Sequence, residues 1–257
     1  MMNDFESALL VLLLAHLVGD FLLQPSVLIS KKKKITWQLI HSLVHGALAY
    51  LLMGAWNMWL PPLIITFTHF LFDGIKNRVI SKDKKGDSLI VFVIDQALHF
   101  IVLVLMVQFF YIPNAVLPVC LNLYPAVAAP VLLILVGVLL LVPFGGILID
   151  YVTHPFQEQL HRKFHPNSLR PIEGLKEGGR IIGYLERLLI FVFILSGEFA
   201  GVGFLVAAKS ILRFGEIKDN ENRKQSEYII IGTFASFLLA FVVSLAVRSL
   251  LQVPPPG

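Results

Sequence analysis

Charged residues are scarce in this sequence. Only 15% of its 257 residues are Asp, Glu, Lys or Arg, whereas 56% are hydrophobic. A typical soluble domain is about 25% charged, so this chain cannot cover a globular surface with polar side chains. The composition therefore excludes a soluble enzyme and a disordered chain, and it predicts an integral membrane protein.

Cysteine is rarer still, because Cys120 is the single one in the sequence. One cysteine excludes an internal disulfide framework and any zinc or iron–sulfur site built from several cysteines. The sequence also lacks a glycine-rich phosphate loop with Lys-Ser/Thr, which argues against an ATP-driven pump. It contains no Gly-x-Ser-x-Gly turn, so a serine hydrolase of that type is not indicated.

Long apolar segments are what the sequence does contain, and a bilayer core takes about 20 apolar residues to cross. Six segments qualify, namely residues 5–24, 36–55, 58–75, 89–111, 126–149 and 228–251. A further apolar run covers residues 181–208. The sequence thus predicts an all-α, polytopic membrane helix bundle with six to eight membrane segments. We expect a four-helix bundle over residues 1–112 and a C-terminal membrane region over residues 113–257.

Basic residues indicate the orientation of these segments. All Lys and Arg residues except Arg187 and Arg248 fall into four patches, within residues 31–34, 76–85, 162–180 and 209–224. Short loops rich in Lys and Arg remain in the cytoplasm. We therefore expect a bacterial inner-membrane protein with its N-terminus outside.

The run 181–208 lies between two patches that belong on the same side. It should therefore form a re-entrant hairpin that turns within residues 196–203, where Gly197, Gly201 and Gly203 cluster. Non-helical backbone at membrane depth is tolerated where protein or water covers it. The alternative is that one half of the run lies in the membrane interface.

Each of the first four apolar segments carries a pair of imidazole or carboxylate side chains spaced i,i+4. The pairs are His16 and Asp20, His41 and His45, His69 and Asp73, and Asp95 and His99. Residues four apart lie on one helix face, one turn from each other. With alternating orientation, all four pairs fall in the cytoplasmic half of the bilayer, so a bundle can direct them at one centre.

An ionisable side chain within a span is costly to insert and marks a functional site by default. Imidazole and carboxylate are ligands of zinc, manganese and iron, so we expect a divalent metal, one of these three. The expected ligands are a subset of His16, Asp20, His41, His45, His69, Asp73 and His99. We expect Gln24 and Gln96 to hydrogen-bond these ligands and fix their orientation. The alternative is that the histidines only join helices through hydrogen bonds.

These motifs carry a family resemblance. Residues 15–24 read AHLVGDFLLQ, His41 and His45 follow, residues 68–76 read THFLFDGIK, and Asp95-Gln96-x-x-His99 completes the set. Over about residues 5–110 this combination resembles the bacterial membrane family called domain of unknown function 3307. In residue types and helical setting it is similar, more loosely, to the YdjM-like membrane-bound metal-dependent hydrolases and to zinc-dependent phospholipases C. That second similarity implies phosphoester hydrolysis.

Two basic residues in the C-terminal region allow two interpretations. Lys209 and Arg213 would bind the phosphate of a lipid or nucleotide substrate, because Arg recognises phosphate through two N–H groups and Lys acts as a point charge. Alternatively, one of them pairs with Glu186 across the arms of the hairpin and compensates its charge. The sequence does not decide between these roles.

Three functional hypotheses follow. The first is a metal-dependent hydrolase that acts on a phosphate-bearing lipid or lipid-linked substrate at the cytoplasmic leaflet, with Asp95 or Asp20 as the general base. The second is a transporter or channel for a divalent metal or protons, in which Asp and His relay the ion. The third is a subunit that binds haem through two histidines or serves as a scaffold.

The expected partner is membrane lipid. Nucleic acid is not expected, because the basic patches lack interleaved aromatic residues. A homo-oligomer and a subunit of a membrane complex are both left open.

Overall fold

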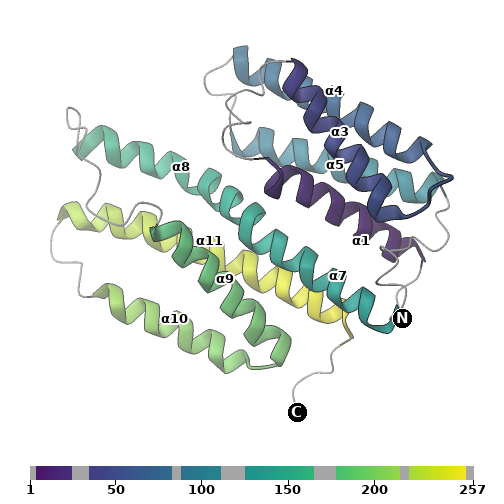
Figure 1. Cartoon of the computed structure of the whole chain (residues 1–257). Coiled ribbons are helices and arrows are strands. Elements are labelled where there is room, and N and C mark those ends of the chain that lie inside the picture. Colours follow the sequence, from purple (N-terminus) through teal and green to yellow (C-terminus); the bar gives the residue numbers. More distant parts are fainter. Residues whose placement is uncertain are drawn as a thin grey trace. The chain divides into compact units, whose positions relative to one another are not determined.

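The computed structural model describes residues 4–24, 35–82, 88–110, 125–164, 178–214 and 220–252. These residues are almost entirely helical, and no strand occurs among them, which confirms the predicted all-α class. The chain divides into two compact units, Met1–Leu139 and Leu140–Gly257 (Figure 1). The sequence led us to expect the second region to begin at residue 113. The division falls later because the helix that starts at Pro125 packs against the first helix of the chain.

The first unit is a ring of four helices with a fifth outside it. Its elements are α1 (Asp4–Leu17), η1 (Val18–Leu22), α3 (Ile35–Met53), α4 (Leu60–Lys82), α5 (Leu89–Phe109) and α7 (Pro125–Leu139). Helix α1 packs against α3, α3 against α4, α4 against α5, and α5 against α1, which closes the ring (Figure 1). Four helices in a closed ring share one interior, and side chains from all of them meet there.

The interior of the ring has an apolar end and a polar end. On each helix a row of side chains four residues apart is buried: Ala8, Leu12 and His16 on α1; His41, His45, Ala49 and Met53 on α3; Ile65, His69 and Asp73 on α4; Asp95, His99, Leu103 and Val107 on α5. Asp20 in η1 continues the first row, and its side chain is 10% exposed. In all four rows the apolar members lie at the same end, where they form the hydrophobic core of the unit. The polar members follow in the next turns of each helix.

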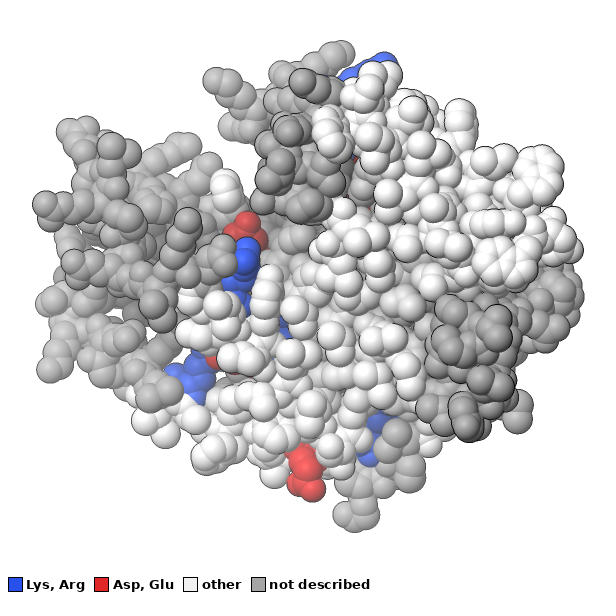
Figure 2. Space-filling model, viewed as in Figure 1, with Lys and Arg blue, Asp and Glu red and all other residues white. Residues whose placement is uncertain are grey.

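Large apolar side chains cover the outside of the ring. On α3, Leu39, Ile40 and Leu43 are exposed while Gln38 and His41 are buried. This distribution is the reverse of a soluble helix, whose polar face is in water. Figure 2 shows one face of the molecule, on which most atoms of the described residues are uncharged. The arrangement suits helices that are surrounded by lipid.

Among the described residues, five helical segments are long and apolar enough to cross a membrane. They are Phe5–Leu22, Ile35–Met53, Leu89–Phe109, Ala129–Phe156 and Glu227–Leu250. The predicted span 58–75 overlaps α4 but is not among them. The predicted span 126–149 also ends earlier than the apolar helical stretch in the structure, which extends to Phe156.

The second unit contains η2 (Leu140–Phe144), α8 (Gly145–Phe164), α9 (Gly178–Ser196), α10 (Phe199–Phe214) and α11 (Asn220–Leu250). Helix α11 packs against α8 and α9, and α10 packs against α9. Helices α9 and α10 form a helical hairpin at the expected position, and its turn is tight. Its re-entrant position in a membrane stays a prediction. Gly197 has a φ of 84°, a left-handed conformation that favours glycine. Gly201 and Gly203 lie inside α10 and not in the turn.

Charged side chains are buried in this unit too, and each has a partner. Arg187 donates from Nε to the carbonyl oxygen of Leu141 and from one terminal nitrogen to Ser236 Oγ. Lys209 Nζ lies 2.5 Å from Glu186 Oε2, so the predicted pairing across the hairpin is confirmed for Lys209. The side chain of Arg213, the other predicted partner, lies outside the described residues.

Candidate metal centre

The polar end of the four-helix ring brings together all eight side chains of the i,i+4 pairs. Each helix supplies one pair, and the rows of buried side chains aim the pairs at one interior. His45 and His69 are each only 1% exposed, and the Asp20 side chain is 10% exposed. The expected convergence is therefore present, while the roles of these residues as ligands or catalysts remain predictions.

Asp20 is positioned by an irregularity of the first helix. The regular turns of α1 end at Leu17, and residues 18–22 form a π-helical turn. Such single π-turns widen a helix and occur often at functional sites. The preceding Gly19 is needed for close packing, because a Cβ atom there would lie 2.5 Å from Cε1 of His45. The imidazole of His45 thus packs directly on the backbone that carries Asp20.

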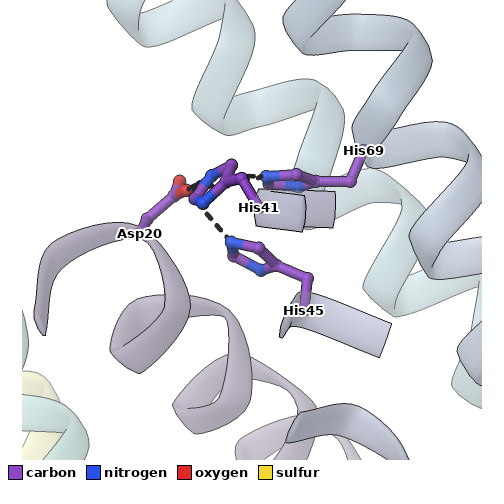
Figure 3. Close-up of side chains that lie close together, drawn as sticks. All are labelled: Asp20, His41, His45 and His69. Carbon is purple, nitrogen blue, oxygen red and sulfur yellow. Dashed lines mark hydrogen bonds and ion pairs between the residues drawn. The ribbon is translucent and has the colours of Figure 1, made fainter. Parts of the chain in front are cut away.

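Three imidazole nitrogens converge around one oxygen of Asp20 (Figure 3). Oδ1 lies 3.1 Å from His41 Nε2, 3.2 Å from His45 Nε2 and 3.6 Å from His69 Nε2. The Nε2 atoms of His41 and His69 are 3.2 Å apart. In a tetrahedral zinc site with ligand bonds of about 2.0–2.1 Å, neighbouring donor atoms lie about 3.3 Å from each other. These four distances are close to that separation, and all four atoms lie within 4.8 Å of one another.

A second group of donors adjoins the first. His69, Asp73 and His99 each offer an atom within 4.8 Å of the others, and all three residues are buried. His99 Nδ1 lies 2.8 Å from the carbonyl oxygen of Asp95. Since a carbonyl oxygen only accepts, Nδ1 carries the proton, and Nε2 is left with its lone pair. This is the tautomer that a metal-binding histidine takes when its other nitrogen is held by an acceptor.

Other polar groups orient the carboxylates. Gln96, which we expected to hold a ligand, donates from Nε2 to Oδ2 of Asp20 at 3.0 Å. Lys76 Nζ lies 2.7 Å from Oδ2 of Asp95, and its side chain is 23% exposed. Gln24 lies four residues beyond Asp20 and is half-buried. No pattern in the sequence separates Lys76 from the basic patch that follows it, because its partner Asp95 belongs to another helix.

Three further predicted roles concern Asp95, Lys209 and Arg213. Asp95, a candidate general base, is buried and ion-paired with Lys76. Lys209, a candidate phosphate ligand, belongs to the second unit and is paired there with Glu186. Arg213 cannot be placed beyond its position in α10, since its side chain is outside the described residues.

Comparison with curated proteins and with solved structures gave no match for this chain. A protein-family model matches residues 8–125, a range that includes all eight side chains of the i,i+4 pairs. The match begins and ends close to the region of the resemblance described above, and it extends into the first residue of α7. Residues 8–125 of the chain are therefore similar to the family described as "Protein of unknown function (DUF3307)".

Proposed function

We propose that the polar end of the ring binds a divalent metal ion, with Asp20, His41, His45 and His69 as ligands. The observation that carries this proposal is the spacing of the donor atoms. Asp20 Oδ1 lies 3.1–3.6 Å from the Nε2 atoms of the three histidines, and the Nε2 atoms of His41 and His69 are 3.2 Å apart. Three imidazoles and one carboxylate in this spacing favour zinc over manganese and iron, which take higher coordination numbers and more oxygen ligands.

We further propose that the centre performs hydrolysis on a phosphate-bearing lipid or lipid-linked substrate. A bound metal ion supplies an activated water and polarises a phosphoryl oxygen. Lys76 provides a cation beside the carboxylates, where it would help to neutralise an anionic headgroup. Asp95, held by Lys76 and within 3.4 Å of the Gln96 amide, is the candidate proton acceptor.

The membrane setting supports this substrate class. Three of the four helices that carry the cluster, α1 with η1, α3 and α5, are long and apolar enough to cross a bilayer. A substrate of this centre would therefore approach it from the membrane, as a lipid headgroup does. Trp56 and Trp59, in the connection between α3 and α4, are 59% and 61% exposed. Such aromatic residues anchor the membrane–water interface. They mark the end of the ring remote from the carboxylates, in accordance with the proposed cytoplasmic location of the polar end.

The first experiment asks whether metal is present and where it binds. The full chain is purified in detergent, and its metal content is measured together with a visible absorption spectrum, which would reveal haem. We expect a stoichiometric first-row metal that is lost in His45→Ala and retained in His154→Ala. His154 is a suitable control because it is exposed and lies on α8. Metal-free protein, or equal metal content in both variants, would refute the metal centre.

The second experiment asks what the centre does. The protein is reconstituted in liposomes of bacterial lipid, and release of phosphate or headgroup is followed. Hydrolysis that stops on chelation and in Asp95→Asn supports the hydrolase. Flux of metal or protons without product release would instead identify a transporter.

One observation favours transport as a second candidate. His45 and His99 each lie ten residues from the first residue of α3 and α5. At 1.5 Å per residue this is about 15 Å along the helix axis, or half of a hydrocarbon core about 30 Å thick. Ion-binding sites of transporters lie near this depth. The carboxylates Asp20, Asp73 and Asp95 lie nearer the helix ends, which is the reason to place hydrolysis first.

A further inference from the structure

The polar end of the ring offers more ligands than one metal ion can use. Seven side chains belong to the two adjoining groups or lie against them: His16, Asp20, His41, His45, His69, Asp73 and His99. A tetrahedral ion takes four of them, and even an octahedral ion takes no more than six. With Asp20, His41, His45 and His69 around one ion, three donors are left.

The first of the remaining donors is His99, and its geometry points to a ligand. Its Nδ1–H is donated to the carbonyl oxygen of Asp95, so its Nε2 carries a lone pair. This Nε2 is buried and has no hydrogen-bond partner among the described residues. The ring centroid of His99 lies 4.2 Å from that of His69 and 5.2 Å from that of His16. A cation bound to Nε2 would take the place of the hydrogen-bond donor that this nitrogen lacks among the described residues.

The carboxylate of Asp20 faces two sets of nitrogen atoms. Oδ1 is the oxygen close to His41, His45 and His69. Oδ2 accepts a hydrogen bond from Gln96 Nε2 at 3.0 Å and lies 3.5 Å from His16 Nε2, which is longer than a normal hydrogen bond. A carboxylate whose two oxygens address different ligand sets is the usual bridge of a dimetal centre in a helix bundle.

We propose that the site holds two divalent ions and that the second is bound by Asp73, His99 and His16, next to the first. This inference rests on the proposed metal centre. His69 belongs to both groups of donors, so the two ions are neighbours, and Asp20 bridges them through its two oxygens. Paired ions about 3.5–4 Å apart hold both the attacking and the leaving oxygen in phosphoryl transfer. The second ion would therefore suit a phosphate ester as the substrate.

The test counts ions in the full chain. Metal-free protein in detergent is titrated with Zn²⁺, and bound metal is measured after removal of free ion. A parallel sample is loaded with Mn²⁺, and its EPR spectrum is recorded. We expect two ions per chain and an exchange-coupled signal. In His99→Ala we expect one ion and an uncoupled signal, while His154→Ala retains two ions and the coupling.

The outcomes separate this inference from the metal centre itself. One ion per chain in the wild type, or two coupled ions in His99→Ala, overturns the second site and leaves the first. No bound ion in the wild type overturns both. If His99→Ala does not fold, His16→Gln gives the same test, because Gln keeps a polar side chain at that position but removes the imidazole. A change from two ions to one supports the proposal, and retention of two refutes it.

Discussion

The two units bury charged and polar side chains among apolar helices in different ways. In the second unit every buried charge that is described has a protein partner. Arg187 donates to Leu141 and Ser236, Glu186 accepts from Lys209, and Arg248 donates to two backbone carbonyls. In the first unit the imidazoles converge on each other and on carboxylates, and His99 leaves a buried nitrogen without a hydrogen bond. Buried polar groups that have hydrogen-bond partners in the protein stabilise the fold. Buried acceptors that converge without a donor indicate a bound ligand.

The partners in the second unit explain why its charges are there. Leu141 belongs to the π-helical turn η2, which contains Pro143 and therefore lacks a regular ladder of backbone hydrogen bonds. Arg187 donates to the carbonyl of Leu141 in this turn. Arg248 donates to the carbonyl oxygens of Ile194 and Leu195, which belong to the last turn of α9. Both arginines thus compensate for breaks in helical backbone, a structural role that needs no ligand.

The largest expected effect tests the first unit. His45→Ala removes a ligand whose nitrogen lies 3.2 Å from Asp20 Oδ1, so metal affinity should fall by more than about 100-fold, the upper range for residues that only support a ligand. Competition with a chromophoric chelator measures the affinity. If the polar groups of the first unit serve a ligand and those of the second unit stabilise the fold, the thermal stability of this variant in excess chelator should differ little from that of the wild type. An affinity within a few-fold of wild type would remove His45 from the ligand set.

The matching substitution in the second unit should reverse this pattern. Arg187→Met leaves the carbonyl of Leu141 and the hydroxyl of Ser236 without their charged donor, at a cost of about 2 kcal/mol in stability. Unfolding in mixed detergent micelles measures the loss. Metal content should remain that of the wild type. Loss of metal without loss of stability would mean that the division between structural and functional polar groups is wrong.

A smaller effect is expected from the backbone under the cluster. In Gly19→Ala the new methyl group meets the ring of His45 at 2.5 Å, so the ring must shift and metal affinity should fall about 10-fold, as for loss of a group that orients a ligand. Gly203→Ala is the control, because a Cβ atom there has open space within 4 Å. Equal affinities in the two variants would show that the packing of His45 on Gly19 does not position a ligand.

The smallest effect concerns the protein without metal. With excess chelator present, His99→Leu should be as stable as the wild type or more stable by up to about 1 kcal/mol. The reason is that burial of a polar atom without a partner costs about 1–3 kcal/mol, and Leu removes that atom, although it also loses the bond to the Asp95 carbonyl. Thermal unfolding in detergent measures the difference. A clear destabilisation would indicate that His99 is a structural residue, like Arg187.

The parts of this picture that the sequence predicts are the local ones. Helix periodicity and i,i+4 spacing are visible within one segment, and they indicated the four pairs and their convergence. The π-turn at residues 18–22, the pairing of Lys76 with Asp95 and the donation from Arg187 to Leu141 depend on contacts far apart in the chain. Periodicity carries no signal for them. Helix ends were also misjudged, because α4 continues through its basic residues to Lys82.

The ordered rows inside the ring have a consequence for assembly. Burial of apolar surface between helices stabilises their packing little in lipid, because the lipid tails are also apolar. The hydrophobic effect alone therefore does little to prevent one helix from sliding along its neighbour. Here a slip of α1 by one turn, about 5.4 Å, would move Asp20 to the level of His16 and press His16 against the layer of Leu12 and Met53. Such a mismatch is unfavourable for both groups. The boundary between the apolar and polar layers thus sets the vertical alignment of all four helices, before any ion arrives.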